Sequence, residues 1–302
     1  MKIIIWLMLF GNAFTAQALM KVQQISPDVY ALVGELSQRS QANLGNNSTH
    51  GVIVTDEGVI LIDSGASYLG AKQIHQIIQK ITDKPIKIVI NTGGQDHRWL
   101  GNGYFKKLGA IIVSSAEARK DQKIRVNSQI SRLDRLIGDS LEGTTPVFAD
   151  TVFKNSYNIE LGNTKLALYY QGGAHTLGDI FVYMPSEKIM FSGDIVFNDR
   201  MLGIGPAKNF QSWMQVFEKM AKFDIKTLIP GHGRASTLET ATHDTYEYLL
   251  FLKKEVAKIL NRDGSLLEIS NIDQSKFHYL KNYESISGKN AGWVFEQMEF
   301  DY

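Results

Sequence analysis

The chain alternates between short apolar runs and longer stretches in which apolar residues recur at helical spacing. Most of the short runs are apolar throughout, as buried strands are. They lie at 29–34, 51–54, 59–63, 86–90, 110–114, 165–170, 180–184, 188–191 and 226–229. The helical patterns cover 69–81, 102–108, 116–137, 210–223 and 237–260. Because predicted strands and helices alternate, the sequence predicts an α/β fold.

Two segments of the chain resemble each other. Residues 51–65 and 179–194 both form apolar hairpin patterns that end in a small-residue loop, Asp63-Ser64-Gly65 in the first and Ser192-Gly193-Asp194 in the second. This internal similarity favours a pseudo-duplicated sandwich of two sheets with helices outside. No linker rich in Pro, Gly or Ser divides the two halves. We therefore expect one domain over residues 19–302, in which the part from Ser265 packs back as a tail.

The first eighteen residues have a pattern of their own. Lys2 precedes an apolar run over 3–10, and Ala16-Gln17-Ala18 follows. This pattern predicts a signal peptide, residues 1–18, and hence a periplasmic or secreted protein. A buried N-terminal helix or an uncleaved anchor is the alternative. The run is too short to span a bilayer and no later segment has twenty uninterrupted apolar residues, so no membrane association is expected after cleavage.

Composition restricts the chemistry and the partners. The chain has no cysteine, so any metal ion must be bound by His, Asp or Glu, and no disulfide supports the fold. Without residues 1–18, the chain carries 31 basic and 31 acidic side chains. No clustered basic face is evident, which argues against a nucleic-acid partner and favours a small-molecule substrate. The oligomeric state is not indicated.

Polar residues that can bind metal follow four of the predicted strands. Loops at strand ends often carry function, and glycines there allow short side chains to converge. The four segments are Gly93-Gly94-Gln95-Asp96-His97, Ala174-His175-Thr176, Ser192-Gly193-Asp194 and Pro230-Gly231-His232. A single histidine beside a glycine is usually structural, but four such loops together predict a metal centre. The histidines outside this setting are not expected to bind metal: His50, His75, His243 and His278.

On these residues the sequence resembles the metallo-β-lactamase-fold hydrolases. Members of that family place HxHxDH after one strand, Gly-xx-His after another, then Gly-Asp and finally Pro-Gly-His. Four corresponding segments occur here in the same order, and the resemblance covers nearly the whole chain after residue 18. It implies a four-layer αββα sandwich with pseudo-duplicated halves. Within the family, the chain most resembles the exported quinoprotein-relay-type zinc metallohydrolases.

The resemblance also reveals two departures. The two leading histidines of HxHxDH, which with Gly-xx-His form the family's first metal site, are replaced by Gly93 and Gln95, so His175 lacks its partners. For the second site the resemblance implies four ligands, namely Asp96, His97, Asp194 and His232. Two imidazoles and two carboxylates suit one Zn²⁺ ion, with iron or manganese as alternatives. Three residues rather than the usual two separate Asp96-His97 from Gly101-Asn102, which predicts a shifted helix start.

The function implied is hydrolysis, in which a metal-bound water attacks an ester, thioester, lactam or phosphoester. Asp96 or Asp194 would accept the proton of that water, while His175 and Gln95 would donate hydrogen bonds to the substrate. Arg200 either contacts an anionic substrate or forms a salt bridge. Arg98 and Trp99 flank the predicted site; a rim of packing and solvated charge is the simpler interpretation, favoured for Trp99, and the sequence leaves the role of Arg98 open. The alternative function is a catalytically retired binding protein that keeps the fold and the metal.

Overall fold

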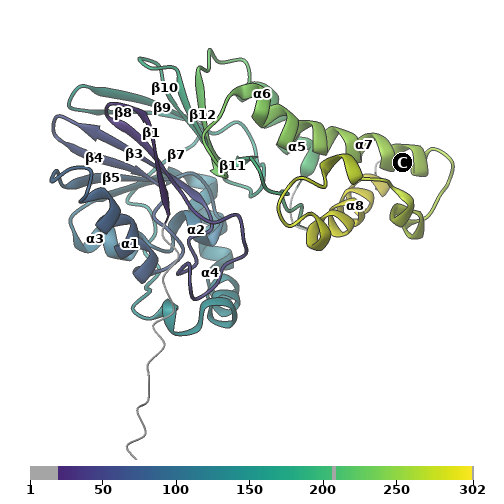
Figure 1. The fold of residues 1–302 in the computed structure, drawn as a ribbon, viewed down its shortest axis with the longest axis horizontal. Helices are drawn as coiled ribbons and strands as arrows, with labels where there is room; N and C mark the ends of the chain where they lie inside the picture. The colour runs from purple at the N-terminus through teal and green to yellow at the C-terminus, as the bar shows by residue number, and fades with distance from the viewer. Residues whose placement is uncertain (1–19, 206–208, 301–302) are drawn as a thin grey trace, which may run out of the picture.

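The structure, a computed structural model, describes residues 20–205 and 209–300, and two β-sheets form its centre (Figure 1). The first sheet has seven strands in chain order: β1 (Lys21–Ser26), β2 (Val29–Val33), β3 (Thr49–Thr55), β4 (Gly58–Ile62), β5 (Ile86–Asn91), β6 (Ile111–Ser115) and β7 (Thr151–Phe153). The second has five strands in the order β12-β11-β10-β9-β8: β8 (Ser156–Leu161), β9 (Thr164–Tyr169), β10 (Phe181–Met184), β11 (Ile189–Phe197) and β12 (Thr227–His232). This arrangement confirms the α/β class and the two-sheet sandwich.

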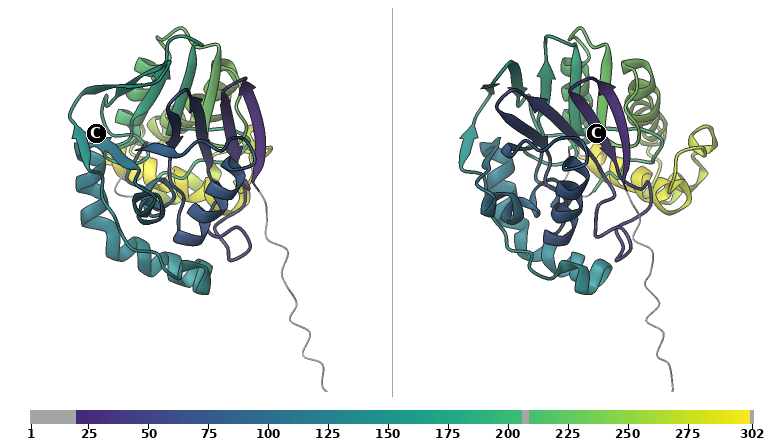
Figure 2. Two further views of the ribbon diagram at one scale, coloured as in Figure 1. Left: turned by 90° about the vertical axis from the view of Figure 1, so that its left-hand side faces the viewer. Right: turned by 60° about the vertical axis from the view of Figure 1, so that its left-hand side comes forward.

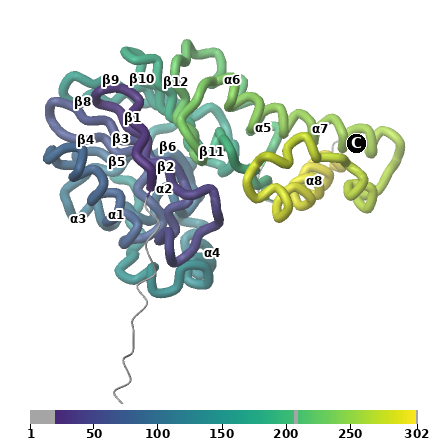
Figure 3. Tube along the Cα trace, viewed as in Figure 1, coloured from purple at the N-terminus to yellow at the C-terminus, as the bar shows by residue number. Residues whose placement is uncertain are grey.

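The helices cover the outer faces of the two sheets. The first half contributes α1 (Tyr68–Ile78), α2 (Asp96–Trp99), α3 (Asn102–Lys107), α4 (Ala116–Ile137) and η1 (Gly138–Leu141). The second half contributes α5 (Phe210–Met220), α6 (Leu238–Ala241), η2 (Thr242–Tyr246), α7 (Glu247–Leu260), η3 (Leu266–Asn271), η4 (Ser275–Phe277) and α8 (Tyr283–Glu299). Helices α7 and α8 extend away from the sandwich, to the right in Figures 1 and 3.

The alternation of side chains along a strand explains the layers. In β4, Ile60 and Ile62 point into the core between the sheets, whereas Val59 and Leu61 belong to the core between the first sheet and its helices. Successive side chains of a strand point to opposite faces, so a continuous apolar run serves two cores at once. The two sheets with helices on either side are visible in the rotated views (Figure 2).

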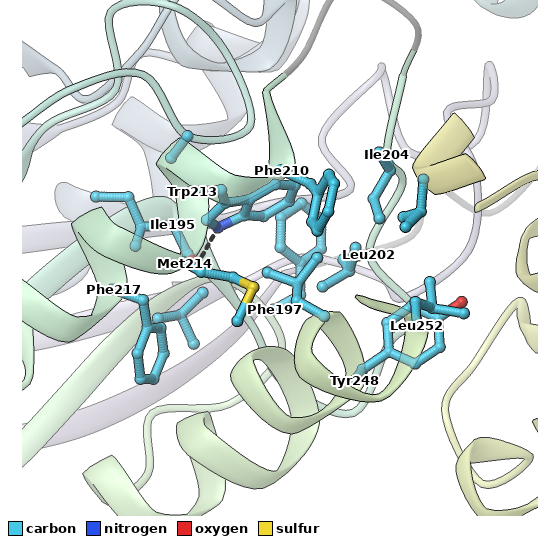
Figure 4. Close-up of a cluster of buried hydrophobic side chains, with 14 of the residues drawn as sticks. Ile195, Phe197, Leu202, Ile204, Phe210, Trp213, Met214, Phe217, Tyr248 and Leu252 are labelled. Atoms are coloured by element: carbon cyan, nitrogen blue, oxygen red, sulfur yellow. Dashed lines mark hydrogen bonds between the residues drawn. The ribbon is translucent and has the colours of Figure 1, made fainter. Parts of the chain in front are cut away.

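A third core joins the second sheet to the C-terminal helices (Figure 4). Trp213 of α5 is fully buried there, and its Nε1 donates a hydrogen bond to the backbone oxygen of Ile195 at 2.9 Å. Phe197 lies in the same cluster, at the end of β11, and its ring stacks on that of His232. Helix packing is therefore connected directly to the end of the strands where the predicted ligands lie.

Several elements differ from the sequence prediction. Strand β11 was expected to end at 191 but continues to Phe197, so Asp194 lies within a strand rather than in a loop after it. The expected helix over 237–260 is interrupted by the π-helical turn η2. In the described part of the chain, no helix has the length and apolarity needed to cross a membrane. The predicted signal peptide, residues 1–18, lies outside the residues that the structure describes.

Candidate metal centre and its pocket

Three side chains from three elements converge at one edge of the sandwich. His97 comes from α2, Asp194 from β11 and His232 from the last position of β12. One ligand atom of each lies within 4.8 Å of the others. His97 Nε2 is 3.0 Å from Asp194 Oδ2, and His232 Nε2 is 3.3 Å from Asp194 Oδ1. Two imidazoles and one carboxylate are therefore arranged around a common point, and all three residues are buried.

Strand β11 has a backbone irregularity directly before Asp194. The pairing of β11 with β12 shifts register on both sides of Gly193, whose φ is +51°. A Cβ atom at this position would lie 2.3 Å from Thr92 Oγ1, so only glycine fits without displacement. Bulges of this kind are frequent next to functional sites, where they redirect a side chain. The Gly-Asp pair in the sequence thus has a local structural reason.

The protonation of His232 leaves room for a cation between its Nε2 atom and the Asp194 carboxylate. His232 Nδ1 is 2.7 Å from the backbone oxygen of Asn47, an acceptor only, so Nδ1 carries the hydrogen. Burial lowers the pKa of His232 well below its usual value, which keeps the ring neutral. Its Nε2 lone pair then faces the Asp194 carboxylate with no proton between them. A metal ion would satisfy both acceptors, so the residues fit such a group.

Asp194 is ionised and held in place by a buried arginine. Burial raises the pKa of the Asp194 carboxyl, but the adjacent Arg98 guanidinium and His97 outweigh burial and hold that pKa well below its usual range. Arg98 Nη2 donates to Asp194 Oδ1 at 2.6 Å, and Nη1 donates to Asp63 Oδ2 at 2.8 Å. The Arg98 side chain is fully buried. Arg98 is therefore no solvated rim residue but a bridge between two buried carboxylates, a role that sequence reasoning missed.

Asp96 does not join the three converging side chains, contrary to the expected ligand set. Its carboxylate is fully buried on another side of His97, where Arg39 contacts it and Arg132 Nη2 donates to it at 3.1 Å. Asp96 Oδ1 also accepts from the His97 backbone NH and lies 3.3 Å from His97 Nδ1. Asp96 is thus a neighbour of a candidate ligand. Because arginines surround it and it does not line the pocket, it is not placed to accept a proton from a water in the pocket.

The place of the family's first metal site is occupied by other groups. A Cβ atom on Gly93 would lie 2.2 Å from Asp179 Oδ1, so a larger residue does not fit without movement there. Burial raises the pKa of Asp179 to about 7, and its carboxylate accepts from the Thr176 backbone NH at 2.6 Å. Gln95 Oε1 accepts from Arg125 Nη1 at 3.4 Å. A guanidinium next to position 95 is unfavourable for a second cation.

A cavity of about 640 Å³ opens at the three converging residues. His97, His232 and the largely buried His175 all line it, and so do Gln95 and Arg200. His175 packs against the rings of Phe197 and Trp213, with centroids 5.3 and 5.4 Å away. Trp99, by contrast, is buried in the core, stacks on Phe148 and donates to Gln129 Oε1. The favoured reading of Trp99 as a packing residue agrees with this geometry.

Comparison with known proteins decides the family. A family model described as the metallo-beta-lactamase superfamily matches residues 45–232. The chain belongs to this superfamily. Relatives within it include metallo-beta-lactamase type 2 of Elizabethkingia meningoseptica, 27% identical over 60% of this chain and 66% of that protein. A protein of the same name from Bacillus sp. (strain 170) is 23% identical over 61% of this chain. The chain thus spans somewhat less than two thirds of these relatives, 65% and 66%.

Solved structures agree on the fold. A metallo-beta-lactamase from Pontibacter korlensis covers 74% of this chain and 96% of its own, with a TM-score of 0.60 at 21% identity. The sec-alkylsulfatase Pisa1 from Pseudomonas sp. covers 94% of this chain and 51% of its own, with a TM-score of 0.72 at 15% identity. These likenesses confirm the metallo-β-lactamase sandwich. The family expected from the motifs is confirmed by the family model, which matches residues 45–232.

The superfamily motif explains why Asp96 is displaced. If HxHxDH begins at Gly93, with Gln95 at the second histidine, its last two places fall on His97 and Arg98, and exactly two residues then precede Gly101-Asn102. His97 therefore stands at the aspartate place and Arg98 at the final histidine place. Successive residues of a helix point about 100° apart, so a shift of one residue exchanges the side chain that faces the centre. The spacing to Gly101-Asn102 was the signal that could have revealed this register.

Proposed function

We propose that the chain is a metal-dependent hydrolase whose single ion, of the zinc type, is bound by His97, Asp194 and His232. The observation that carries the proposal is the convergence of these three side chains, with the His232 tautomer set by Asn47 and its Nε2 left as an acceptor. Two imidazoles and one carboxylate occur in catalytic zinc sites and also in non-haem iron sites. Zinc is therefore the first expectation, with iron or manganese as alternatives.

The number of protein ligands favours catalysis over a purely structural ion. Structural zinc sites are closed by four protein ligands, whereas catalytic sites use three and keep one position open. Exclusion of Asp96 leaves three ligands here, and two of them line the 640 Å³ cavity. A substrate in this cavity would therefore have direct access to the ion. This is the feature that separates an enzyme from the rival function, a retired binding protein that holds a metal.

A bound metal ion would supply Lewis acidity and a water of lowered pKa. The residues of this chain prepare the site for that chemistry. Arg98 keeps Asp194 ionised and fixes its orientation. To bind through Nε2, His97 must carry its proton on Nδ1, where Asp96 Oδ1 is an acceptor 3.3 Å away. Arg39 Nη2, which can only donate, also contacts this Nδ1, so metal binding requires Arg39 to turn its donor towards Asp96 alone. His175 and Gln95 line the cavity and are the groups that can donate hydrogen bonds to the substrate.

A single ion is proposed because the first site does not suit a cation. Position 93 has no side chain, and Asp179 fills the space that a larger residue would need. Position 95 bears an amide that already accepts from Arg125. A second ion there would have one imidazole, His175, and a guanidinium close by, which is a poor set of neighbours for a divalent cation.

Substitution of His175 tests the difference between binding metal and handling substrate. We expect His175→Ala to retain the metal content of the wild type but to reduce kcat by roughly 10²–10³-fold, the usual effect of removing one donor that stabilises developing negative charge. Steady-state kinetics and elemental analysis on the same preparation measure both quantities. If metal is lost along with activity, His175 is a ligand and the three-residue site is incomplete.

Substitution of Asp96 tests its proposed supporting role. A carboxylate that orients a ligating histidine typically contributes 10–100-fold to metal affinity, so Asp96→Asn is expected to weaken zinc binding by roughly that factor. Competition titration against a fluorescent chelator gives the affinity. Complete loss of zinc binding would instead make Asp96 a direct ligand, whereas an unchanged affinity would exclude any role at the site.

The reaction itself is tested by a substrate screen. The bond types proposed are ester, thioester, lactam and phosphoester, to which lactones and, from the fold likeness to an alkylsulfatase, sulfate esters are added. His232→Ala is the control in each assay, because hydrolysis that survives this change does not come from the proposed centre. Metal binding without hydrolysis of any of these classes would favour the retired binding protein.

Export is proposed on the pattern of residues 1–18 alone. A periplasmic or secreted location predicts that N-terminal sequencing of the mature protein from a host that exports it begins at Leu19. A mature protein that still begins at Met1 in the cytoplasm would contradict the proposal. The more specific likeness to quinoprotein-relay-type hydrolases stays a prediction.

A further inference from the structure

The wall of the cavity beside the candidate metal centre is strongly cationic. Five charged side chains line it, all of them basic: Arg39, Arg125, Arg132, Arg200 and Lys289. Within the described ranges, no carboxylate belongs to this lining. They come from parts of the chain that are far apart, namely the segment before β3, helix α4, the segment after β11 and helix α8. The fold thus gathers positive charge around one opening.

The carboxylates behind the wall are too few to balance it. Arg39 and Arg132 share the single carboxylate of Asp96. Arg125 has its own partner, Asp121, to which its Nε donates at 2.8 Å. Lys289 is exposed on α8 and, in the described part of the chain, forms no salt bridge. Positive charge is therefore in excess at the cavity, because two guanidiniums share one carboxylate and Lys289 has no carboxylate partner among the described residues.

Arg200 is the clearest case of missing negative charge. Only 5% of this residue is exposed, and its contacts are to neutral acceptors. Its Nη1 donates to the backbone oxygen of Ser37 at 2.8 Å and its Nη2 to Gln38 Oε1 at 3.4 Å. Its buried Nε has no hydrogen-bond partner, and no carboxylate of the described residues forms a salt bridge with it. A buried charge without a counter-charge is unfavourable, and an anionic ligand in the cavity would supply one.

The other part of the same lining is apolar. Phe197, Met201, Ile286 and Trp293 all contribute to the cavity. Ile286 and Trp293 lie on α8, the helix that also carries Lys289, and both are partly exposed. A cavity with basic groups and an aromatic and aliphatic surface fits a ligand that has an anionic end and an apolar body.

We propose that the substrate of this site is an amphiphilic anion, an apolar body that carries a sulfate, phosphate or carboxylate group, and that Arg200 binds the anionic group. The inference rests on the proposed hydrolase function, since it names the substrate class of the same cavity. The planar guanidinium matches the geometry of such oxyanions and can donate two parallel hydrogen bonds. Arg39, Arg132 and Lys289 add attraction around it.

Binding of a simple probe tests the proposal without any need for turnover. Hexyl sulfate is titrated into the metal-loaded full-length protein by calorimetry, with hexanol and hexyltrimethylammonium as neutral and cationic probes of equal chain length. Hexyl sulfate is expected to bind at least roughly tenfold more tightly than either. Arg200→Gln is expected to weaken hexyl sulfate binding by roughly tenfold or more, and Lys289→Gln by roughly twofold to fivefold.

Matched controls separate charge recognition from structure. Arg135→Gln removes an exposed arginine of α4 that does not line the cavity, and it should leave the affinity unchanged. Arg200 also donates hydrogen bonds to Ser37 and Gln38, so the melting temperature is measured for each variant. If Arg200→Gln does not fold, Lys289→Gln tests the contribution of positive charge from an exposed position. Equal affinity for hexyl sulfate and hexanol, or equal effects of Lys289→Gln and Arg135→Gln, would overturn the proposal. Anion binding without hydrolysis would contradict only the proposed function.

Discussion

Replacement of Arg98 by methionine is expected to destabilise the metal-free protein by about 3–5 kcal/mol, the usual effect of removing one partner from a buried ion pair. The guanidinium bridges Asp63 and Asp194, and it also donates to the Gly231 backbone oxygen at 2.7 Å. Methionine fills similar space but leaves two buried carboxylates uncompensated. Urea denaturation in the presence of a chelator gives the difference in free energy of unfolding.

An exposed arginine provides the comparison for this experiment. Arg234 pairs with Asp199 on the surface, and Arg234→Met should change the free energy of unfolding by no more than about 1 kcal/mol. Zinc should restore part of the stability of Arg98→Met, because an ion at Asp194 would replace some of the lost positive charge. An Arg98→Met protein as stable as the wild type would show that the buried bridge is not needed to hold the two strand ends together.

Replacement of His232 by alanine is expected to remove the bound metal and, with it, the hydrolytic activity. The loss of one of three protein ligands leaves one imidazole and one carboxylate, which is too few for a stable zinc site. The variant should still fold, since His232 makes one backbone hydrogen bond, to Asn47, and otherwise contacts Asp194 and the rings of Phe197 and His97. Elemental analysis, kinetics and thermal melting of one preparation measure the three effects.

A surface histidine serves as the matched control for His232. His278 is exposed, its Nε2 lies 3.2 Å from Glu284 Oε1 and its ring packs on that of Tyr283, so His278→Ala should keep both metal and activity. Retention of one metal ion per chain in His232→Ala would mean that the ion is bound elsewhere. Loss of activity with metal retained would give His232 a role in substrate binding instead.

The core of the fold could be predicted from sequence because its strands are apolar throughout. Helix α4 was predicted with its observed bounds, and β4 and β5 within a residue or two at each end. Strands β1, β7 and β8 were not predicted, since each carries several half-exposed or exposed positions and so lacks a continuous apolar run. Edge strands of this kind are recognised by their pairing partners, which a single sequence does not reveal.

The candidate site was predictable in part for a similar reason. In the sequence, His97, Asp194 and His232 come after apolar runs in glycine-containing segments, and these local patterns indicate the right segments of the chain. Which residue of α2 points to the centre, Asp96 or His97, depends on the register of the helix. The composition of the segment does not reveal that register. The role of Arg98 could not be predicted from the sequence, because its burial depends on Asp63, directly after β4, and on Asp194 in β11.

The most direct test of the three-ligand centre is anomalous diffraction from crystals soaked in zinc. We expect one ion per chain, at about 2.0–2.2 Å from the Nε2 atoms of His97 and His232 and from a carboxylate oxygen of Asp194. The Asp96 carboxylate should stay with Arg39 and Arg132. An ion bound by Asp96, a second ion beside His175, or no ion at all would contradict a single three-ligand centre at His97, Asp194 and His232.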